Sequence, residues 1–218
     1  MTEYRVRRVN LRYRLEVPSQ RAGSESMPMV IMIHGRGADM NDLADLAPLL
    51  DTPTGARFVF PNAPKPFEAY PGMSFGWTWF EGWPPEQSSV SESREVLLQF
   101  LDEITAEYPT SSLIISGFSQ GAMMSLDVGL RRDAAAIIAM SGGLYDHDLP
   151  DLSARRQTPV LISHGAIDEV VSVNYARRAR AVLEAAGFDV EYHEYPMGHQ
   201  VVMEEVAVVK DFIARHAR

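Results

Sequence analysis

Residues 117–121 read Gly117-Phe118-Ser119-Gln120-Gly121, a serine between two glycines. The apolar run before them, residues 112–116, is typical of a buried strand, and residues 122–131 have the apolar content of a helix. The serine therefore lies on a tight turn from a strand into a helix. Such a turn strains the serine backbone, and residues without bulk let the strand and the helix approach closely. We expect the hydroxyl to project from the turn beside the amide of Gln120.

The composition predicts one compact domain over residues 1–218, since 46% of the residues are hydrophobic. Asp and Glu number 29 and Lys and Arg 20, and the net charge of −9 argues against a nucleic-acid partner. The chain has no cysteine. Disulfides, thiolate metal sites and a cysteine nucleophile are therefore excluded.

Neither a leader nor a membrane span is expected. Residues 1–14 include basic residues but no apolar segment behind them, which argues against a secretory signal. Apolar runs such as residues 29–33 are far shorter than the roughly 20 residues that cross a bilayer. We therefore expect a cytoplasmic protein without stable membrane insertion. The oligomeric state is left open, a homodimer included.

Apolar runs alternate with helical patterns along the chain, which predicts a mostly parallel sheet with helices on both faces. The predicted strands are residues 9–17, 29–33, 57–60, 112–116, 135–140, 160–164 and 190–195, with a bulge or turn near Arg7-Arg8 before the first. The predicted helices are residues 41–50, 89–108, 122–131, 175–186 and 202–213. Ser89 and Glu92 have capping-box spacing, and Gly187 is expected to end a helix. In such sheets the ligand lies beyond the carboxyl ends of the strands.

Residues 61–89 show little periodicity and are predicted to form a long loop. They hold six prolines and all three tryptophans of the chain. A loop of this length inside a compact domain is uncommon and usually functional. We expect an aromatic cluster over one end of the sheet, a lid on an apolar pocket, or both.

A serine hydroxyl becomes a nucleophile when a base takes its proton, and histidine suits that task near neutral pH. His199 follows the last predicted strand in a Met-Gly loop, and we predict it to be the base. His34 and His164 end strands that are followed by glycine, and we expect them to hold loops through hydrogen bonds. The remaining histidines lack such a setting.

Asp168 is the predicted acid, because it follows the penultimate strand and precedes a helix; the adjacent Glu169 is its main rival. The order Ser119, Asp168, His199 is the order of the α/β-hydrolase triad, in which the serine lies on a nucleophile elbow. The acid would fix the imidazole tautomer and stabilise the imidazolium.

An acyl-transfer site also needs two donors for the oxyanion. The amide of Gln120 is one predicted donor. The second should come from the loop after the strand at residues 29–33, where the amide of Arg36 is the best candidate and that of Gly37 the next.

Several motifs resemble those of the phospholipase/carboxylesterase family of small α/β-hydrolases, which includes acyl-protein thioesterases and bacterial carboxylesterases. They are His34-Gly35-Arg36-Gly37 with Asp39, residues 117–121, Trp79-Phe80-Glu81, residues 164–171 and Gly198-His199. The resemblance covers nearly the whole chain. It implies the α/β-hydrolase fold and hydrolysis of carboxylic esters or thioesters of short to medium acyl chains through a serine acyl-enzyme, without a cofactor. A metal is not expected either, because the sequence has no paired-histidine helix motif and no acidic cluster at ligand spacing.

Residues in or beside these motifs are expected to contact the substrate: Gly37, Trp79, Phe80 and Met197. Three features depart from the family pattern. Arg36 stands where thioesterase relatives usually carry an apolar residue, Ala122 replaces a second glycine after the elbow, and the segment after Asp39 lacks the usual run of small residues.

The leading hypothesis is a carboxylesterase acting on a small-molecule ester or thioester. The alternative is an acyl-protein thioesterase or lysophospholipase with a deeper apolar groove, and the remote one a non-catalytic ligand-binding protein of the same fold. A further hypothesis is that the side chain of Arg36 favours substrates with negative charge.

Overall fold

A computed structural model describes residues 2–6, 11–17, 27–53, 55–70 and 72–217. Within these ranges one sheet of eight strands runs through the molecule. The strands are β1 (Thr2–Val6), β2 (Arg12–Glu16), β3 (Met29–Ile33), β4 (Arg57–Pro61), β7 (Leu113–Phe118), β8 (Ala136–Met140), β9 (Val160–Gly165) and β10 (Val190–Tyr195). Their order in the sheet is β1-β2-β4-β3-β7-β8-β9-β10.

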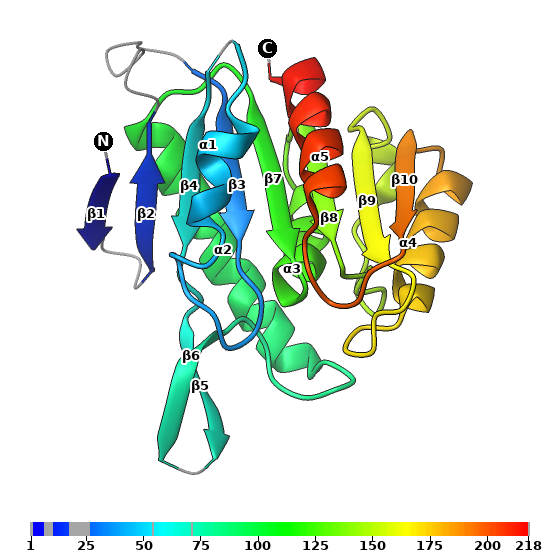
Figure 1. Ribbon diagram of the computed structural model, residues 1–218, viewed down its shortest axis with the longest axis horizontal. Coiled ribbons are helices and arrows are strands. Elements are labelled where there is room, and N and C mark those ends of the chain that lie inside the picture. Colours follow the sequence, from blue (N-terminus) through cyan, green and yellow to red (C-terminus); the bar gives the residue numbers. More distant parts are fainter. Residues whose placement is uncertain (1, 7–10, 18–26, 54, 71, 218) are drawn as a thin grey trace.

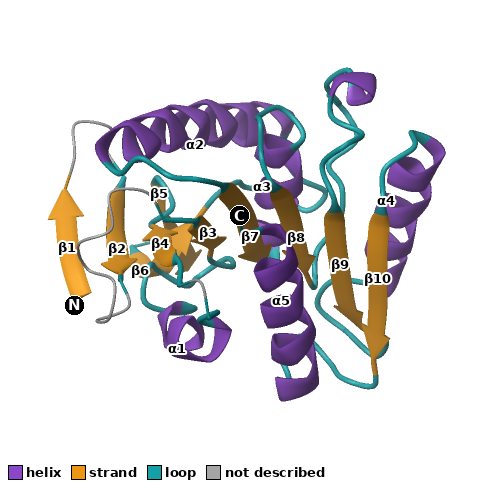
Figure 2. Ribbon diagram, turned by 90° about the horizontal axis from the view of Figure 1, so that it is seen from above, coloured by secondary structure: helices purple, strands orange, loops and turns teal. Residues whose placement is uncertain are grey.

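Only the edge at β1 and β2 is antiparallel; from β4 to β10 every neighbouring pair is parallel. Parallel strands need crossover connections, and helices supply them. They include α1 (Ala47–Leu50), α2 (Gln87–Glu107), α3 (Gln120–Gly129) and α4 (Val173–Ala185), whereas α5 (Met203–His216) follows the last strand. Figures 1 and 2 show α2, α3 and α4 on one face of the sheet and α1 and α5 on the other. The predicted α/β-hydrolase architecture is confirmed.

The central strands are buried on both faces, so their side chains feed two cores. In β3 Met29, Ile31 and Ile33 belong to the buried cluster that includes side chains of α2, α3 and α4. Val30 and Met32 belong to the cluster that includes side chains of α1 and α5. This alternation follows from the two-residue period of a strand. It explains why β3 is a continuous apolar run in the sequence.

The prediction of an irregular loop over residues 61–89 was wrong. β5 (Lys65–Tyr70) and β6 (Met73–Thr78) form an antiparallel hairpin, which Figure 1 shows projecting below the sheet. The pairing register shifts twice, on either side of Glu68, and most of the hairpin is exposed. Irregular pairing and exposure on both faces remove the alternation of apolar and polar residues, so these two strands leave no strand pattern in the sequence.

Some predicted boundaries also change. Only residues 44–50 of the predicted helix 41–50 are helical, a 3₁₀ turn (Ala44–Leu46) followed by α1. α2 begins at Gln87, and Ser89 accepts a hydrogen bond from the Glu81 amide, so Ser89 forms no capping box. Gly187 follows α4 with φ 90°, as a C-terminal cap requires. Another short 3₁₀ turn spans Leu152–Ala154.

One prediction falls outside the described residues, the bulge or turn near Arg7-Arg8. Among the helices that the structure describes, none has both the length and the apolar composition needed to cross a membrane.

Candidate active site

Ser119 lies on the turn between β7 and α3 in a conformation rare for a residue with a side chain, φ 58° and ψ −119°. Its flanking glycines are required by close backbone approach. A Cβ on Gly117 would overlap the Gly121 carbonyl, and a Cβ on Gly121 would overlap the Ile33 carbonyl of β3. The Ser119 amide donates to the Met140 carbonyl at 2.9 Å. The strained turn is therefore held by main-chain packing from three strands.

His199 lies in the loop after β10, and its Nε2 is 2.9 Å from the Ser119 Oγ. The His199 ring leans on the Phe118 ring, with centroids 4.8 Å apart. The imidazole is partly open to solvent, with 16% of its side chain exposed. A substrate could thus reach the serine from the same side as the imidazole.

Asp168 follows β9, and its Oδ2 lies 2.7 Å from the His199 Nδ1. Its Oδ1 accepts the amides of Val170 and Val171 at 2.8 and 2.9 Å. Burial of the carboxyl raises its pKa, but the hydrogen bonds from His199, Val171 and Val170 outweigh burial and lower the pKa below its usual value. An ionised Asp168 only accepts hydrogen bonds, so Nδ1 of His199 carries the proton and Nε2 faces the serine as an acceptor. The rival Glu169 is exposed.

His34 and His164 hold loops, as predicted. The Nε2 of His34 accepts the Ala63 amide at 3.0 Å, so its Nδ1 carries the proton and donates to the Gly35 carbonyl at 2.7 Å. Burial lowers the pKa of His34 to about 4, consistent with this neutral form. The Nε2 of His164 donates to the Val171 carbonyl at 2.8 Å, which supports the loop that carries Asp168.

The loop after β3 runs alongside the serine: a Cβ on Gly35 would lie 3.3 Å from the Ser119 Cβ. The amide of Gly37 donates to the Trp77 carbonyl at 2.8 Å and is therefore occupied. Within the described ranges, the amides of Arg36 and Gln120 donate to no protein acceptor. Gln120 is also the first residue of α3, where the helix dipole favours negative charge. Arg36 and Gln120 thus remain the two candidate oxyanion donors.

The side chain of Gln120 makes contacts that the sequence did not suggest. Its Oε1 accepts from the Thr78 hydroxyl and the Trp79 amide, and its Nε2 donates to the Phe80 carbonyl at 2.7 Å. One buried amide therefore fixes the residues after β6 to the serine turn. The one local hint of these contacts is that Gln120 is polar, although the backbone amide at this position could come from many residue types.

Trp79 differs from its predicted role. Its indole is fully buried, and Nε1 donates to the His34 carbonyl at 2.9 Å. The ring thus supports the loop of Arg36 from within the core, and in this conformation no face of the ring is open to a substrate. Met197 is buried as well, and its carbonyl accepts the Ile167 amide at 3.2 Å.

Two pockets are lined by residues that contact the serine turn. One, of about 540 Å³, lies between the Arg36 loop and the hairpin, and Phe80 lines it. The other, of about 210 Å³, is lined by aromatic side chains together with Met123, which lies one turn into α3. Those aromatic residues are Trp83, Tyr145, His147 and Tyr175.

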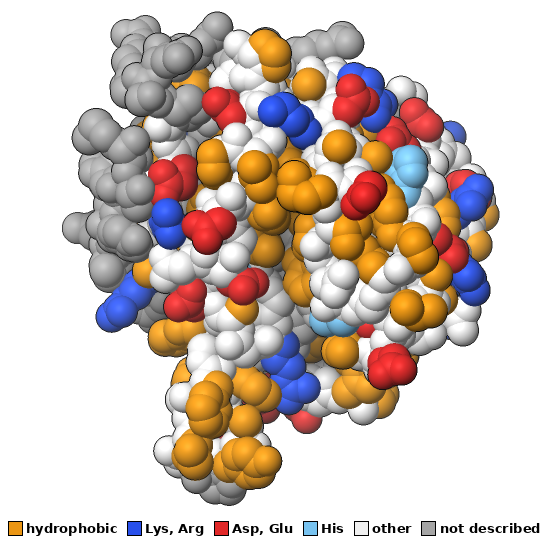
Figure 3. Space-filling model, in the orientation of Figure 1, with side chains coloured by type: hydrophobic (Ala, Val, Ile, Leu, Met, Phe, Trp, Pro, Cys, Tyr) orange, Lys and Arg blue, Asp and Glu red, His pale blue; other side chains and the backbone are white. Residues whose placement is uncertain are grey.

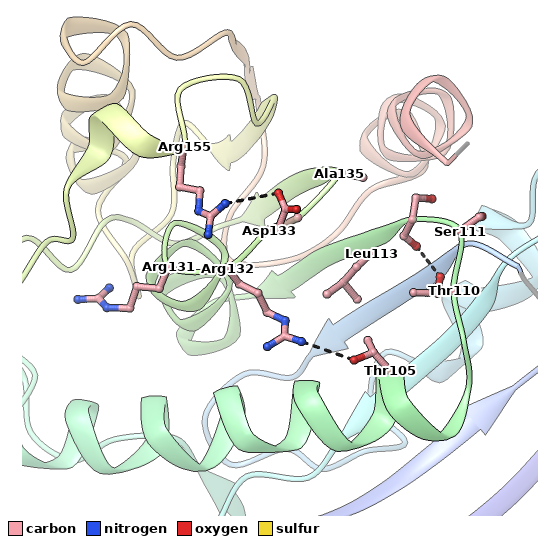
Figure 4. A pocket seen from close by; sticks show the side chains of 11 residues that line it. Thr105, Thr110, Ser111, Leu113, Arg131, Arg132, Asp133, Ala135 and Arg155 are labelled. Carbon is pink, nitrogen blue, oxygen red and sulfur yellow. Dashed lines mark hydrogen bonds and ion pairs between the residues drawn. The ribbon is translucent and has the colours of Figure 1, made fainter.

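A further pocket, of about 680 Å³, lies at the start of β7 (Figure 4). Ser119 follows the other end of this strand. Three arginines line it, but each is paired with an aspartate. This pocket is therefore not part of the candidate site. In the part of the chain that the structure describes, no three His, Asp or Glu residues are grouped as metal ligands.

Comparison with known proteins places this geometry in context. The family model described as "Phospholipase/Carboxylesterase" matches residues 17–217. Acyl-protein thioesterase 1 of Neurospora crassa is 30% identical over 183 residues, 72% of each chain. Acyl-protein thioesterase 1 of Candida albicans is 30% identical over 88% of this chain and 93% of its own.

Solved structures of esterases are similar to this one. The crystal structure of esterase PE8 superposes with a TM-score of 0.78 at 31% identity, covering 88% of this chain and 93% of that one. A carboxylesterase from Mesorhizobium loti superposes with a TM-score of 0.80 over 98% of both chains at 22% identity, which supports the fold alone.

Proposed function

The chain belongs to the phospholipase/carboxylesterase family, and from this premise we propose that it is a serine carboxylesterase that hydrolyses short- to medium-chain carboxylic esters. The observation that carries the proposal is the continuous hydrogen-bonded path from Ser119 through His199 to Asp168, at 2.9 and 2.7 Å. A serine, a base within reach and an acid that orients the base are the parts that acyl transfer needs.

In the first half of the reaction, the Ser119 Oγ attacks the acyl carbon while Nε2 of His199 takes its proton. The amides of Arg36 and Gln120 donate to the oxyanion that forms, and losing one such donor typically costs roughly 3–4 kcal/mol of transition-state stabilisation. The intermediate collapses when the bond to the alcohol breaks and His199 returns the proton to the leaving oxygen. The products of this half are a free alcohol and an acyl-enzyme on Ser119.

In the second half, water attacks the acyl carbon and gives a proton to His199 Nε2, and the proton then returns to the Ser119 Oγ. The acid leaves and the enzyme is restored. Asp168 stays ionised and stabilises the imidazolium in both halves. Its lowered pKa supports this role, because a carboxylate that protonates readily could not do so.

The aromatic pocket supports short or medium acyl chains. Its volume of about 210 Å³ is below the roughly 300–1,000 Å³ of typical small-molecule sites. Asp146 and Arg178, which form an ion pair, also line it, so the pocket is not wholly apolar. Gly37 remains a proposed substrate contact, whereas the side chain of Phe80 is only 2% exposed and, like that of Trp79, is not proposed as one.

The second candidate is an acyl-protein thioesterase, which the names of the fungal relatives favour. The same steps would release a thiol in place of an alcohol. Turnover of 4-nitrophenyl esters from two to sixteen acyl carbons, beside matched thioesters, separates the two. A carboxylesterase is expected to peak at short or medium chains, whereas a maximum at sixteen carbons with preference for the thioester would favour the alternative.

Labelling with a fluorophosphonate tests the chemistry itself. We expect one modified residue, mapped by peptide mass spectrometry to Ser119, and no label on the folded Ser119→Ala variant. A label on another residue, or no label on folded wild-type protein, would reject the nucleophile. Absence of any label would favour the remaining hypothesis, a ligand-binding protein of the same fold.

A further inference from the structure

Arg36 combines a backbone role with a side chain that the proposed chemistry leaves unused. Its amide is a candidate oxyanion donor, and Arg36 follows Gly35, on which a Cβ would lie 3.3 Å from the Ser119 Cβ. Its guanidinium is exposed and lines the pocket of about 540 Å³ beside the hairpin. The guanidinium therefore faces whichever part of a substrate enters that pocket.

The guanidinium is held in place. Its Cζ lies 4.5 Å from the centroid of the Phe67 ring on β5, the distance of a cation–π contact. The loop behind it is also fixed, because Ala38 and Trp77 pair as a short antiparallel bridge between the loop and β6. A pre-positioned guanidinium loses less freedom when it binds a ligand than a freely rotating one.

The charge of Arg36 is not neutralised by the protein. Among the described residues no carboxylate lies within ion-pair distance of its guanidinium. The other cation of the pocket differs, since Lys65 Nζ lies 2.6 Å from a Glu92 carboxylate oxygen. Only Arg36 therefore offers an unpaired positive charge to this pocket.

From this geometry we propose that Arg36 binds a carboxylate of the substrate, so that the preferred substrates are esters carrying a free carboxylate a few bonds from the scissile carbonyl. The inference rests on the proposed esterase function. A guanidinium can donate two parallel hydrogen bonds to a carboxylate, which gives strength and orientation. The carboxylate can belong to the acyl part of the ester, as in the monoester of a dicarboxylic acid, or to the alcohol part, as in the ester of a hydroxy acid.

Three carboxylates, those of Glu68, Glu81 and Glu86, also line the pocket. They define the opposing prediction, a preference for cationic esters. Because none of them pairs with Arg36, the guanidinium held over Phe67 is expected to dominate over carboxylates on the pocket wall. A charge series of substrates decides between the two.

The experiment measures kcat/KM for pairs of esters of equal length. Mono-4-nitrophenyl adipate against 4-nitrophenyl hexanoate tests the acyl part, and 4-acetoxybenzoate against 4-methylphenyl acetate tests the alcohol part. Butyrylcholine against 3,3-dimethylbutyl butanoate tests a cation. In at least one anionic pair we expect the wild type to prefer the anion by roughly 10- to 100-fold, the range of a charge-assisted hydrogen bond. Raised salt should reduce this ratio.

Arg36→Leu should bring the anion-to-neutral ratio close to one, and Arg36→Lys should keep part of the preference. Effects of either substitution on the oxyanion amide act on both members of a pair and cancel in the ratio. Lys65→Met is the matched control, expected to change the ratio by less than about threefold. A wild-type ratio near one, a ratio that Arg36→Leu leaves intact, or a preference for the cationic ester overturns the proposal.

A binding measurement separates this inference from the esterase proposal. Calorimetry with adipate needs no turnover, and we expect the wild type to bind the dianion roughly tenfold more tightly than Arg36→Leu. Equal binding by the two proteins would reject the carboxylate site, whatever the labelling of Ser119 shows. Unequal binding without esterase turnover would reject the esterase function and leave the anion site standing.

Discussion

The serine turn and the hairpin β5–β6 both border the candidate site, but they are built in opposite ways. In residues 117–121 every residue except Phe118 is buried, and two glycines are fixed by backbone contact. In the hairpin Tyr70, Met73 and Phe75 are 50% exposed or more, and Figure 3 shows their end of the molecule covered with apolar side chains. Close packing constrains the first region to a narrow set of sequences, whereas the second can vary with little effect on the rest of the fold.

The largest expected effect tests whether the buried region carries the chemistry. Asp168→Asn keeps the shape but adds a donor toward Nδ1 of His199, which favours the tautomer that cannot accept the serine proton. We expect kcat on 4-nitrophenyl acetate to fall roughly 10⁴-fold. Glu169→Gln makes the same chemical change at the exposed neighbour and should alter kcat less than about threefold. Comparable losses in both variants would mean that Asp168 is not the acid.

The second prediction compares one glycine from each region. In Gly121→Ala the new methyl overlaps the Ile33 carbonyl, and since both are main chain, neither can move freely. We expect a loss of about 3 kcal/mol or more in the free energy of unfolding, measured with urea. Gly72→Ala in the hairpin meets no atom within 4 Å and faces only its φ of 79°, which should cost about 1 kcal/mol. Equal losses would remove the distinction between the two regions.

The same contrast explains what the sequence could predict. Strands β3, β7, β8 and β9 are buried on both faces, so each is a continuous apolar run, and each ends in a polar or glycine motif at the carboxyl edge. Local sequence patterns were therefore enough to predict the sheet and the loops in which Ser119, Asp168 and His199 lie. The family's motifs carried the same information.

What the sequence did not reveal depends on contacts between distant segments. The indole of Trp79 faces inward because its N–H donates a hydrogen bond to the His34 carbonyl. The side chain of Gln120 donates a hydrogen bond to the carbonyl of Phe80, forty positions away in the sequence. Neither relation leaves a local pattern. The hairpin was missed because its pairing shifts register at Glu68 and its side chains are mostly exposed.

The third prediction concerns an acid buried behind the site. Glu205 in the first turn of α5 is fully buried, and burial raises its pKa to about 6, against a partial offset from the Ser163 hydroxyl and the Val202 backbone. Its folded pKa thus lies above the ordinary value of 4.5. The stabilising contribution of the neutral acid is complete below about pH 4.5 and is lost as the pH rises through 6.

Glutamine mimics the neutral acid at every pH. Glu205→Gln should therefore exceed the wild type by about 2 kcal/mol in unfolding free energy at pH 8 and by much less at pH 4.5. Urea titrations at the two pH values measure the change in the gap. A constant gap would mean that Glu205 does not titrate differently in the folded protein, and a wild type that is the more stable at pH 8 would indicate that the carboxylate is ionised and satisfied.

The smallest expected effect lies at the exposed end of the hairpin. Met73→Ser and Phe75→Ser remove apolar side chains that are 54% and 50% exposed, so each should change the free energy of unfolding by less than about 0.5 kcal/mol. Unfolding is followed at two protein concentrations, because a face that packs on a second copy of the chain would lose stability in a concentration-dependent way. A loss above 1 kcal/mol that does not depend on concentration would place the hairpin in the cooperative fold. The contrast with the serine turn would then be one of exposure alone.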